Sequence, residues 1–403
     1  MNAADFSALD HAHMAHALRL AERGLYTTQP NPRVGCVIAH GAEVVGSGFH
    51  QRAGGPHAEV FALREAGEQA RGATAYVTLE PCAHHGRTPP CADALIAAGI
   101  ARVVVAVADP FDQVDGRGIE RLRAAGVTVD VGLLGEQARE LNLGFFSRIE
   151  RARPWVRVKL AMSLDGRTAL ADGDSKWITG EAARADVQRW RARSSAILTG
   201  SGTVLADNPH LTVRLGAAGA PGSLSSNSFT VGGEGWGEGE AFASAASTSR
   251  ASTSVNFIPP LRVVLDRQLR TPPDSHVLDG NAPTLLLHGA DVPSGGDARF
   301  AKAERARVAE QDNRLDLPAV LSLLAARDIN ELHVEAGPTL CGALFAAGLV
   351  DELLLYIAPL FLGDRARPLL HLPTLTEMTE RWQLRTIEQR QLGADWRLRL
   401  RPA

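Results

Sequence analysis

The chain has 403 residues, of which 45% are apolar and 22% are charged, and its net charge at pH 7 is −3. This length exceeds what one hydrophobic core usually holds, so we expect two globular domains. A slightly acidic sequence without a basic run lacks the charge pattern of a nucleic-acid binder. No apolar segment approaches the ~18–20 residues that cross a bilayer, and the polar N-terminus does not resemble a secretion signal. We therefore expect a cytoplasmic protein with neither nucleic-acid nor membrane partners.

Helical and β-rich segments alternate through the first 150 residues. Apolar spacing predicts a helix over 7–23, which ends before Gly24. Further elements are expected at 34–38, 44–47, 57–66, 75–79, 91–98, 103–107, 118–125, 127–131 and 136–146. This alternation favours a parallel or mixed sheet with helices on both faces. A charged stretch ending at Pro154 then predicts a domain boundary near residue 150, which gives domains 1–150 and 151–403.

The first predicted helix carries three histidines, His11, His13 and His16. Residues two positions apart do not face each other on a helix, so these side chains are not expected to form a metal cluster. We interpret them as part of a solvated helix face.

The most specific chemistry of the sequence lies between residues 57 and 91. His57, Cys82 and Cys91 supply one imidazole and two thiols, and Glu59 follows the histidine by two positions. Such a set suits zinc, because three protein ligands leave the fourth tetrahedral position open for water. Bound zinc lowers the pKa of that water toward ~7, and a nearby carboxylate that is not a ligand can carry its proton. The pattern predicts a catalytic site with one zinc ion per chain and Glu59 as the proton carrier.

Two non-catalytic interpretations of this set stay open. A structural zinc site would need a fourth protein ligand, for which His84 and His85 are candidates. A disulfide between the two thiols is disfavoured, because four cysteines in 403 residues are typical of a reducing compartment. The two remaining cysteines, Cys36 and Cys341, lie in apolar runs and are expected in the core.

The motif around the thiols departs from the common zinc-deaminase signature, because eight residues rather than two separate Cys82 from Cys91. In this form Thr78–Cys91, together with Asn31–Val37, resembles the deaminase half of the bifunctional riboflavin-biosynthesis deaminase–reductases. The resemblance implies an N-terminal cytidine-deaminase-like αβα sandwich. It also implies that Asn31, His50, His84 and Arg87 contact the deaminase substrate, with Arg87 at its phosphate.

Strands and helices alternate again in the second half of the chain. They are expected at 155–162, 261–266, 284–288, 317–326, 331–335, 352–357 and 395–400. Four segments resemble the reductase half of the same family, namely Lys159–Thr168, Asp174–Gly180, Thr199–Arg214 and Val334–Leu344. The resemblance implies a C-terminal dihydrofolate-reductase-like α/β domain that binds NADPH.

The segment Val334–Leu344 has the pattern of a strand, a glycine turn and a helix start. A helix N-terminus attracts a pyrophosphate, but Gly337 and Gly342 lack the spacing of a Rossmann fingerprint, so this signal alone is weak. By resemblance the residues around NADPH are Ala161, Trp177, Thr203, Asp207, Gly337, Pro338, Thr339, Leu340, Cys341, Gly342 and Ala343. By resemblance the reductase substrate is held by Ser175, Arg191, Leu211, Arg214 and Glu335. Lys159 is a further candidate polar group near the hydride transfer.

Residues 216–260 interrupt this pattern. Gly, Ser, Ala and Thr dominate the segment, and such a composition cannot bury enough apolar surface to offset chain entropy. We predict a flexible insertion within the reductase domain.

These observations predict a two-step enzyme of riboflavin biosynthesis with small-molecule pyrimidine substrates. The deaminase would hydrolyse the ring amine of 2,5-diamino-6-(5-phosphoribosylamino)pyrimidin-4-one, and the reductase would use NADPH to convert the ribosyl group to ribityl. One alternative is a cytidine- or tRNA-type zinc deaminase fused to an unrelated nucleotide-binding domain. Another is a non-catalytic nucleotide-binding protein with structural zinc, against which Glu59 argues. We also expect a homo-oligomer.

Overall fold

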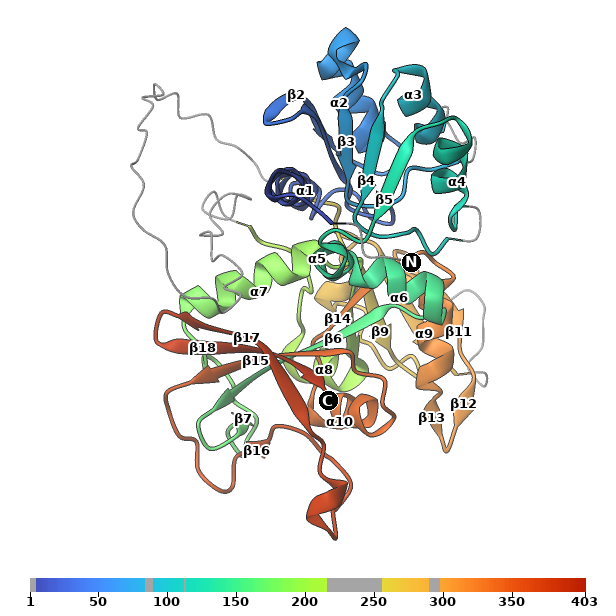
Figure 1. The fold of residues 1–403 in the computed structure, drawn as a ribbon. Helices are drawn as coiled ribbons and strands as arrows, with labels where there is room; N and C mark the ends of the chain where they lie inside the picture. Colours follow the sequence, from blue (N-terminus) through green and yellow to red (C-terminus); the bar gives the residue numbers. More distant parts are fainter. Residues whose placement is uncertain (1–4, 84–89, 112–113, 216–255, 290–297) are drawn as a thin grey trace, which may run out of the picture.

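The computed structural model describes residues 5–83, 90–111, 114–215, 256–289 and 298–403. A five-stranded sheet belongs to the N-terminal half of the chain and a nine-stranded sheet to the C-terminal half. The two units lie one above the other, with helices α5 (Gly135–Leu141), α6 (Leu143–Arg151) and α7 (Glu181–Arg193) near their junction (Figure 1). None of the described helices is long and apolar enough to cross a membrane.

The N-terminal unit is a mixed sheet with helices on both faces. Before α5 its elements are α1 (Ala8–Glu22), β1 (Gly35–His40), β2 (Glu43–Phe49), α2 (Ala58–Ala66), β3 (Thr74–Val77), α3 (Cys91–Ala97), β4 (Arg102–Val105), α4 (Arg117–Ala124) and β5 (Thr128–Val131). The strand order is β2-β1-β3-β4-β5. Strand β1 is antiparallel to β2 and β3, whereas β3, β4 and β5 are parallel. This architecture confirms the predicted αβα sandwich.

Alternation along β1 explains the two layers of helices. Cys36 and Ile38 point to one face, where they join the buried residues of α2, α3 and α4. Val37 and Ala39 point to the opposite face, where they meet α1. Successive strand residues face opposite sides of a sheet, so a continuous apolar run needs a cover on each side. The apolar run Cys36–Ala39 of this strand therefore specifies the sandwich.

Two glycines of β2 bring α2 close to the sheet. A Cβ at Gly48 would lie 2.4 Å from the carbonyl oxygen of Ala58, and one at Gly46 would lie 2.2 Å from that of Ala62. Any side chain at these positions would push the helix outward. Because His57 caps this helix and Glu59 lies in its first turn, the glycines help to set the position of both site residues.

The C-terminal unit is built on a long, mainly parallel sheet. Besides α7 its elements are β6 (Trp155–Ser163), β7 (Arg167–Ala169), β8 (Ala196–Gly200), α8 (Ser201–Asp207), β9 (Leu261–Leu265), β10 (Thr284–His288), β11 (Glu304–Arg307), β12 (Glu310–Gln311), β13 (Arg314–Leu315), α9 (Leu317–Ala325), β14 (Glu331–Val334), α10 (Pro338–Ala346), β15 (Glu352–Ala358), β16 (Arg367–Pro368), β17 (Leu384–Leu392) and β18 (Asp395–Pro402). The order is β11-β10-β9-β8-β14-β6-β15-β18-β17, and only β18 and β17 join in antiparallel fashion.

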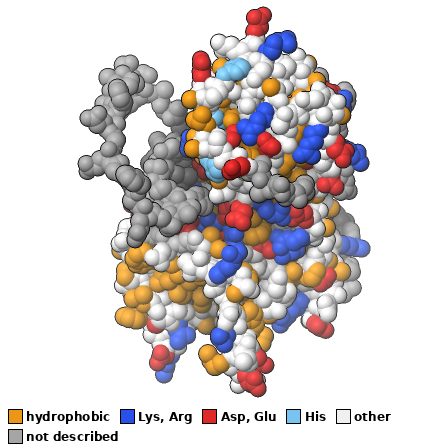
Figure 2. All heavy atoms as spheres, in the orientation of Figure 1, with side chains coloured by type: hydrophobic (Ala, Val, Ile, Leu, Met, Phe, Trp, Pro, Cys, Tyr) orange, Lys and Arg blue, Asp and Glu red, His pale blue; other side chains and the backbone are white. Residues whose placement is uncertain are grey.

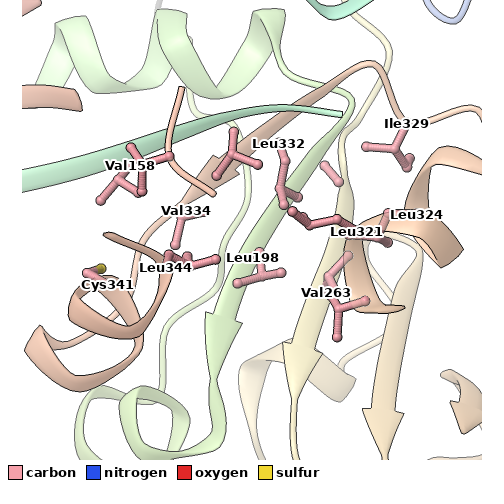
Figure 3. Close-up of a cluster of buried hydrophobic side chains, with 14 of the residues drawn as sticks. Val158, Leu198, Val263, Leu321, Leu324, Ile329, Leu332, Val334, Cys341 and Leu344 are labelled. Carbon is pink, nitrogen blue, oxygen red and sulfur yellow. The ribbon is translucent and has the colours of Figure 1, made fainter. Parts of the chain in front are cut away.

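One face of this sheet packs against α9 and α10. Leu198 and Leu332 project from neighbouring strands toward Leu321 of α9 and Leu344 of α10 (Figure 3). Full burial of such a leucine contributes ~1.5–3 kcal/mol. This cluster fixes the start of α10 at the carboxyl end of β14, which is where the glycine turn was predicted.

Buried ion pairs join the two units. Glu331 of β14 is paired with Arg33 at 2.7 Å, with Arg157 at 2.8 Å and with Arg193 at 3.1 Å. Arg33 belongs to the N-terminal unit, and the other three residues belong to the C-terminal unit. Burial alone would raise the pKa of Glu331, but Arg193, Arg33 and Arg157 hold it well below its ordinary value. The junction is therefore held by a charged cluster.

Two expectations change in the structure. The single helix expected over 136–146 is two helices, because Asn142 leaves the helical conformation at φ −119° and its side chain bonds the backbone of Arg33. His13 is buried rather than solvated, since its Nε2 reaches the Gly41 carbonyl oxygen at 2.7 Å and its ring lies beside Tyr76. The predicted insertion lies outside the described residues except for 256–260.

Candidate active sites

Three elements of the N-terminal unit bring the predicted metal ligands together. His57 caps α2, Cys91 is the first residue of α3, and Cys82 follows β3 after a short loop. The Nδ1 atom of His57 lies 3.2 Å from the sulfur of Cys91 and 3.6 Å from that of Cys82. The ligand atoms of the three residues all lie within 4.8 Å of one another. Residues 25 and 34 positions apart in the chain thus converge on one point.

This donor set fits zinc. Tetrahedral zinc with one nitrogen and two sulfur ligands separates its donors by about 3.5–3.8 Å. Among the described residues, no further histidine, cysteine or carboxylate joins the cluster. His84 and His85, the candidates for a fourth ligand, lie outside the described residues. All four cysteines are free, so the alternative of a disulfide between Cys82 and Cys91 is wrong for this fold.

The surroundings favour the ionised forms of Cys82 and His57, whereas the hydrogen bond to Cys82 and burial raise the pKa of Cys91. A hydrogen bond from the Cys91 thiol lowers the pKa of Cys82 to about 4, and the bond from Cys82 raises the pKa of His57 to about 9. The backbone N–H of Cys91, at the start of α3, also donates to the Cys82 sulfur at 3.3 Å. A thiolate is the form of cysteine that binds a metal, so Cys82 is prepared for this role.

Glu59 is almost fully buried beside the three ligands, with 3% of its surface exposed. Its Oε2 has no hydrogen-bond partner among the described residues. Burial raises the pKa of this carboxyl group. A buried carboxylate oxygen without a partner is costly, and such oxygens are found at functional sites.

His57, Cys82 and Glu59 line a cavity of about 250 Å³. Asn31 and His50, both predicted to contact substrate, line it. The Nδ1 of His50 lies 3.0 Å from the Pro56 carbonyl oxygen and its Nε2 lies 3.2 Å from the Asn31 amide nitrogen. These contacts orient the His50 ring, with Nδ1 donating to Pro56. Two other predicted contacts, His84 and Arg87, lie outside the described residues.

Sequence reasoning missed several residues of this cavity, above all Asp109, Phe111 and Arg148. Burial raises the pKa of Asp109 to about 6. Glu80 holds the loop that carries this residue, because its carboxylate accepts the backbone N–H groups of Asp109, Gly116, Gly118 and Ile119. Asp109 could have been found, since it follows the strand parallel to β3 and the carboxyl ends of parallel strands share one edge.

The C-terminal unit holds a larger cavity, of about 900 Å³, at the carboxyl ends of its parallel strands. It is lined by most of the residues predicted around the dinucleotide: Ala161, Trp177, Thr203, Asp207, Gly337, Pro338, Thr339, Leu340 and Ala343. Of the predicted substrate residues, Ser175, Leu211 and Glu335 line it, together with Lys159. The start of α10 borders this cavity, and a Cβ at its cap residue Gly337 would meet open space. Volume and helix placement therefore suit a dinucleotide.

Four predicted residues do not line this cavity. Cys341 is buried in the apolar core, and a Cβ at Gly342 would lie 2.1 Å from the His371 carbonyl oxygen. Arg214 is exposed, and its backbone nitrogen bonds Gln188. Arg191 lies beside the cavity and pairs with the carboxylate of Glu335, at 2.6 and 2.7 Å.

Two of the charged residues that line the larger cavity are Glu335 and Lys159. Burial would raise the pKa of Glu335, but Arg191 holds it well below its ordinary value, so the group stays ionised. Burial lowers the pKa of Lys159, while the charge of Glu335 opposes this effect. The two side chains provide one carboxylate and one amine that can hold polar atoms of a ligand.

The fold and the two sites define a class, namely a zinc deaminase joined to a reductase that uses a nucleotide cofactor. Residues 7–107 match the cytidine and deoxycytidylate deaminase zinc-binding region, and residues 154–398 match the RibD C-terminal domain. The chain belongs to the RibD family of bifunctional riboflavin-biosynthesis deaminase–reductases. The expected enzyme class is thereby confirmed, and the alternatives of an unrelated second domain and of a non-catalytic protein are wrong.

Relatives resemble the chain over nearly its whole length. Riboflavin biosynthesis protein RibD of Escherichia coli (strain K12) is 48% identical, over 96% of this chain and 97% of its own length. The RibD protein of Haemophilus influenzae is 45% identical, over 99% of both chains. The solved structure of Acinetobacter baumannii RibD, form 1, has a TM-score of 0.82 at 40% identity and covers 98% of this chain and 99% of its own. Both active units are therefore present in family order, with zinc and NADPH as cofactors.

Proposed function

We propose that this chain deaminates 2,5-diamino-6-(5-phosphoribosylamino)pyrimidin-4-one and then reduces the ribosyl group of the product to ribityl. The observation that carries the proposal is the cluster of His57, Cys82 and Cys91 with the buried Glu59 beside it. A second support is the solved Thermotoga maritima protein, a diaminohydroxyphosphoribosylaminopyrimidine deaminase/5-amino-6-(5-phosphoribosylamino)uracil reductase, which is 30% identical over 98% of this chain. Its TM-score to this fold is 0.78. We place the two activities in residues 1–150 and 151–403.

In the deaminase, His57, Cys82 and Cys91 would hold zinc, which when bound supplies an activated water. The unpartnered Oε2 of Glu59 accepts a proton from the attacking water and delivers it to the leaving amine. Asn31 and His50, fixed by their mutual contact, orient the pyrimidine in the cavity. His84 and Arg87 complete this proposed substrate set.

In the reductase, the residues at the start of α10, together with Ala161, Trp177, Thr203 and Asp207, would hold NADPH, which when bound supplies the hydride. Glu335, oriented by Arg191, and Lys159 hold polar groups of the ribose near the carbon that receives the hydride. Ser175 and Leu211 line the same space. Arg214 lies outside this cavity and belongs to the proposed set by resemblance alone.

Removal of the metal separates the two activities. With the diaminopyrimidine substrate and NADPH, the intact protein is expected to release ammonia and oxidise NADPH, whereas without NADPH the deaminated pyrimidine accumulates. After treatment with a zinc chelator, ammonia release is expected to stop. NADPH oxidation with the deaminated pyrimidine supplied directly continues, because none of the zinc ligands lines the larger cavity. The measurements are ammonia release and absorbance of NADPH, and full ammonia release by the metal-free protein would contradict the proposal.

We also propose that the chain forms a homo-oligomer through its second unit. Hydrophobic side chains gather over the region of β17 and β18 (Figure 2), and Trp396 and Leu384 on these strands are 43% and 37% exposed. Strand β17 also forms an edge of the large sheet. Light scattering that gave the mass of a single chain would contradict this proposal.

We further propose that the protein acts in a reducing, cytoplasmic compartment, because its four cysteines are free. Cell fractionation tests this proposal.

A further inference from the structure

The C-terminal unit holds one wall of the deaminase cavity in place. Arg148 of α6 lines the same cavity as His57, Cys82 and Glu59. Its Nε donates to Asn330 Oδ1 at 2.6 Å, and its Nη1 donates to Asp328 Oδ1 at 3.0 Å. Both acceptors precede β14 of the C-terminal unit and lie about 180 positions further along the chain. The third nitrogen, Nη2, makes no hydrogen bond within the described part of the chain, so a donor stays available.

Asn330 contacts two parts of that cavity. Its side chain, in a residue only 4% exposed, accepts from Arg148 and also donates from Nδ2 to the Pro30 carbonyl oxygen at 2.7 Å. Pro30 lines the cavity next to Asn31. One buried residue of the reductase thus positions both α6 and the substrate loop of the deaminase.

Arg148 carries a positive charge in a cavity lined by several acidic side chains. Acidic residues among its described lining are Glu59, Glu80 and Asp109, whereas Arg148 is the one lysine or arginine among them. A phosphomonoester has a charge near −2 at neutral pH and is repelled by carboxylates. Arginine binds phosphate oxygens through its planar N–H groups, and these charge-assisted bonds are among the stronger hydrogen bonds.

The ion pair of Arg148 with Asp328 contributes little to the stability of the junction. The carboxylate partner, Asp328, is 65% exposed in its side chain, and an exposed pair adds little stability. Arg151 and Arg153, by contrast, share the buried carboxylate of Asp351 and already tie the end of α6 to the second unit. The half-buried position of Arg148 on the cavity wall favours a ligand contact.

We propose that Arg148 binds the phosphate of the deaminase substrate and that Asn330 and Asp328 of the reductase unit hold its guanidinium in place. The assignment rests on the proposed function, since it takes the phosphoribosyl group as the ligand. The deaminase site is then completed only when the reductase unit is docked. Arg148 is a binding residue for the first reaction and has no part in the second.

The test compares two substrates and three variants in the full-length zinc protein. Arg148→Gln removes the charge, Arg148→Lys keeps it, and Arg151→Gln is the matched control, because it lies on the same helix and the same junction but outside the cavity. Each is assayed with the phosphorylated diaminopyrimidine and with the same compound lacking the phosphate. For Arg148→Gln we expect KM for the phosphorylated compound to rise by about 10- to 100-fold, with kcat within a few-fold of the parent. The compound without phosphate should react as it does with the parent.

The remaining variants separate binding from folding. Arg148→Lys should recover part of the lost affinity, and Arg151→Gln should leave both KM values near those of the parent. If Arg148→Gln raises KM equally for the two substrates, the residue does not bind the phosphate and the assignment is wrong. Failure of the proposed function has a different signature, since the parent protein itself would then deaminate neither compound. Reductase activity of every variant, measured on the deaminated pyrimidine, reports that the chain has folded.

Discussion

Replacing Glu59 by glutamine is expected to lower the rate of ammonia release by at least ~10³-fold while leaving zinc content and reductase activity unchanged. Glutamine has the size of glutamate but cannot accept the proton of the attacking water. The carboxylate of Glu59 is buried and lines the cavity, and its Oε2 has no hydrogen-bond partner among the described residues. Another group could restore the lost rate only if it accepted the proton from the same position. The measurements are single-turnover ammonia release and zinc content per chain.

A matched control for this variant is Glu65→Gln. Glu65 lies on the same helix but outside the cavity, where its carboxylate accepts a hydrogen bond from the backbone N–H of Ser47. It should release ammonia at close to the parental rate. If Glu59→Gln instead released ammonia at the parental rate, Glu59 would not be the proton carrier.

The variant Glu331→Gln is expected to lower the free energy of unfolding by ~3–5 kcal/mol, the usual cost of removing one partner from a buried ion cluster. Glu331 has 1% side-chain exposure and faces Arg33, Arg157 and Arg193. The amide keeps one oxygen, but its NH₂ group must point at a guanidinium, so donors face donors. Urea unfolding at pH 7 measures the change.

The pH dependence of this difference gives a second check. Because the folded-state pKa of Glu331 is depressed, its stabilisation is present above the unfolded pKa of ~4.3 and is lost as pH falls toward the folded value. The gap between parent and variant should therefore narrow below about pH 4.5. The control is Glu304→Gln, whose exposed pair with Arg327 should contribute less than ~1 kcal/mol. A gap that stays constant down to pH 3 would contradict the assigned role of the charged cluster.

Local chemistry in the sequence was enough for the zinc cluster and for most of the secondary structure. His57, Cys82 and Cys91 are residue types with few other uses in such a pattern, and the structure brings them together as predicted. In the N-terminal unit, helices and strands follow from short-range apolar periodicity, so their order and approximate bounds were predictable. In the C-terminal unit, α7, β8, α8 and β17 were not predicted. The break at Asn142 was not, because it depends on the Asn142 amide bonding the backbone of Arg33, 109 positions away.

The amino-acid sequence by itself determined the zinc ligands, the proposed proton carrier and the alternation that makes each unit an α/β layer. Only the tertiary structure decided which charged side chains form ion pairs and hydrogen bonds with one another. Arg33 and Glu331 are separated by 298 positions, and Arg148 is held by residues about 180 positions away. From the sequence alone, a charged residue is interpreted as a solvated surface group. Only the tertiary structure shows whether its side chain is buried and ion-paired. Residues that act through such long-range contacts leave no periodic or spaced pattern in the chain.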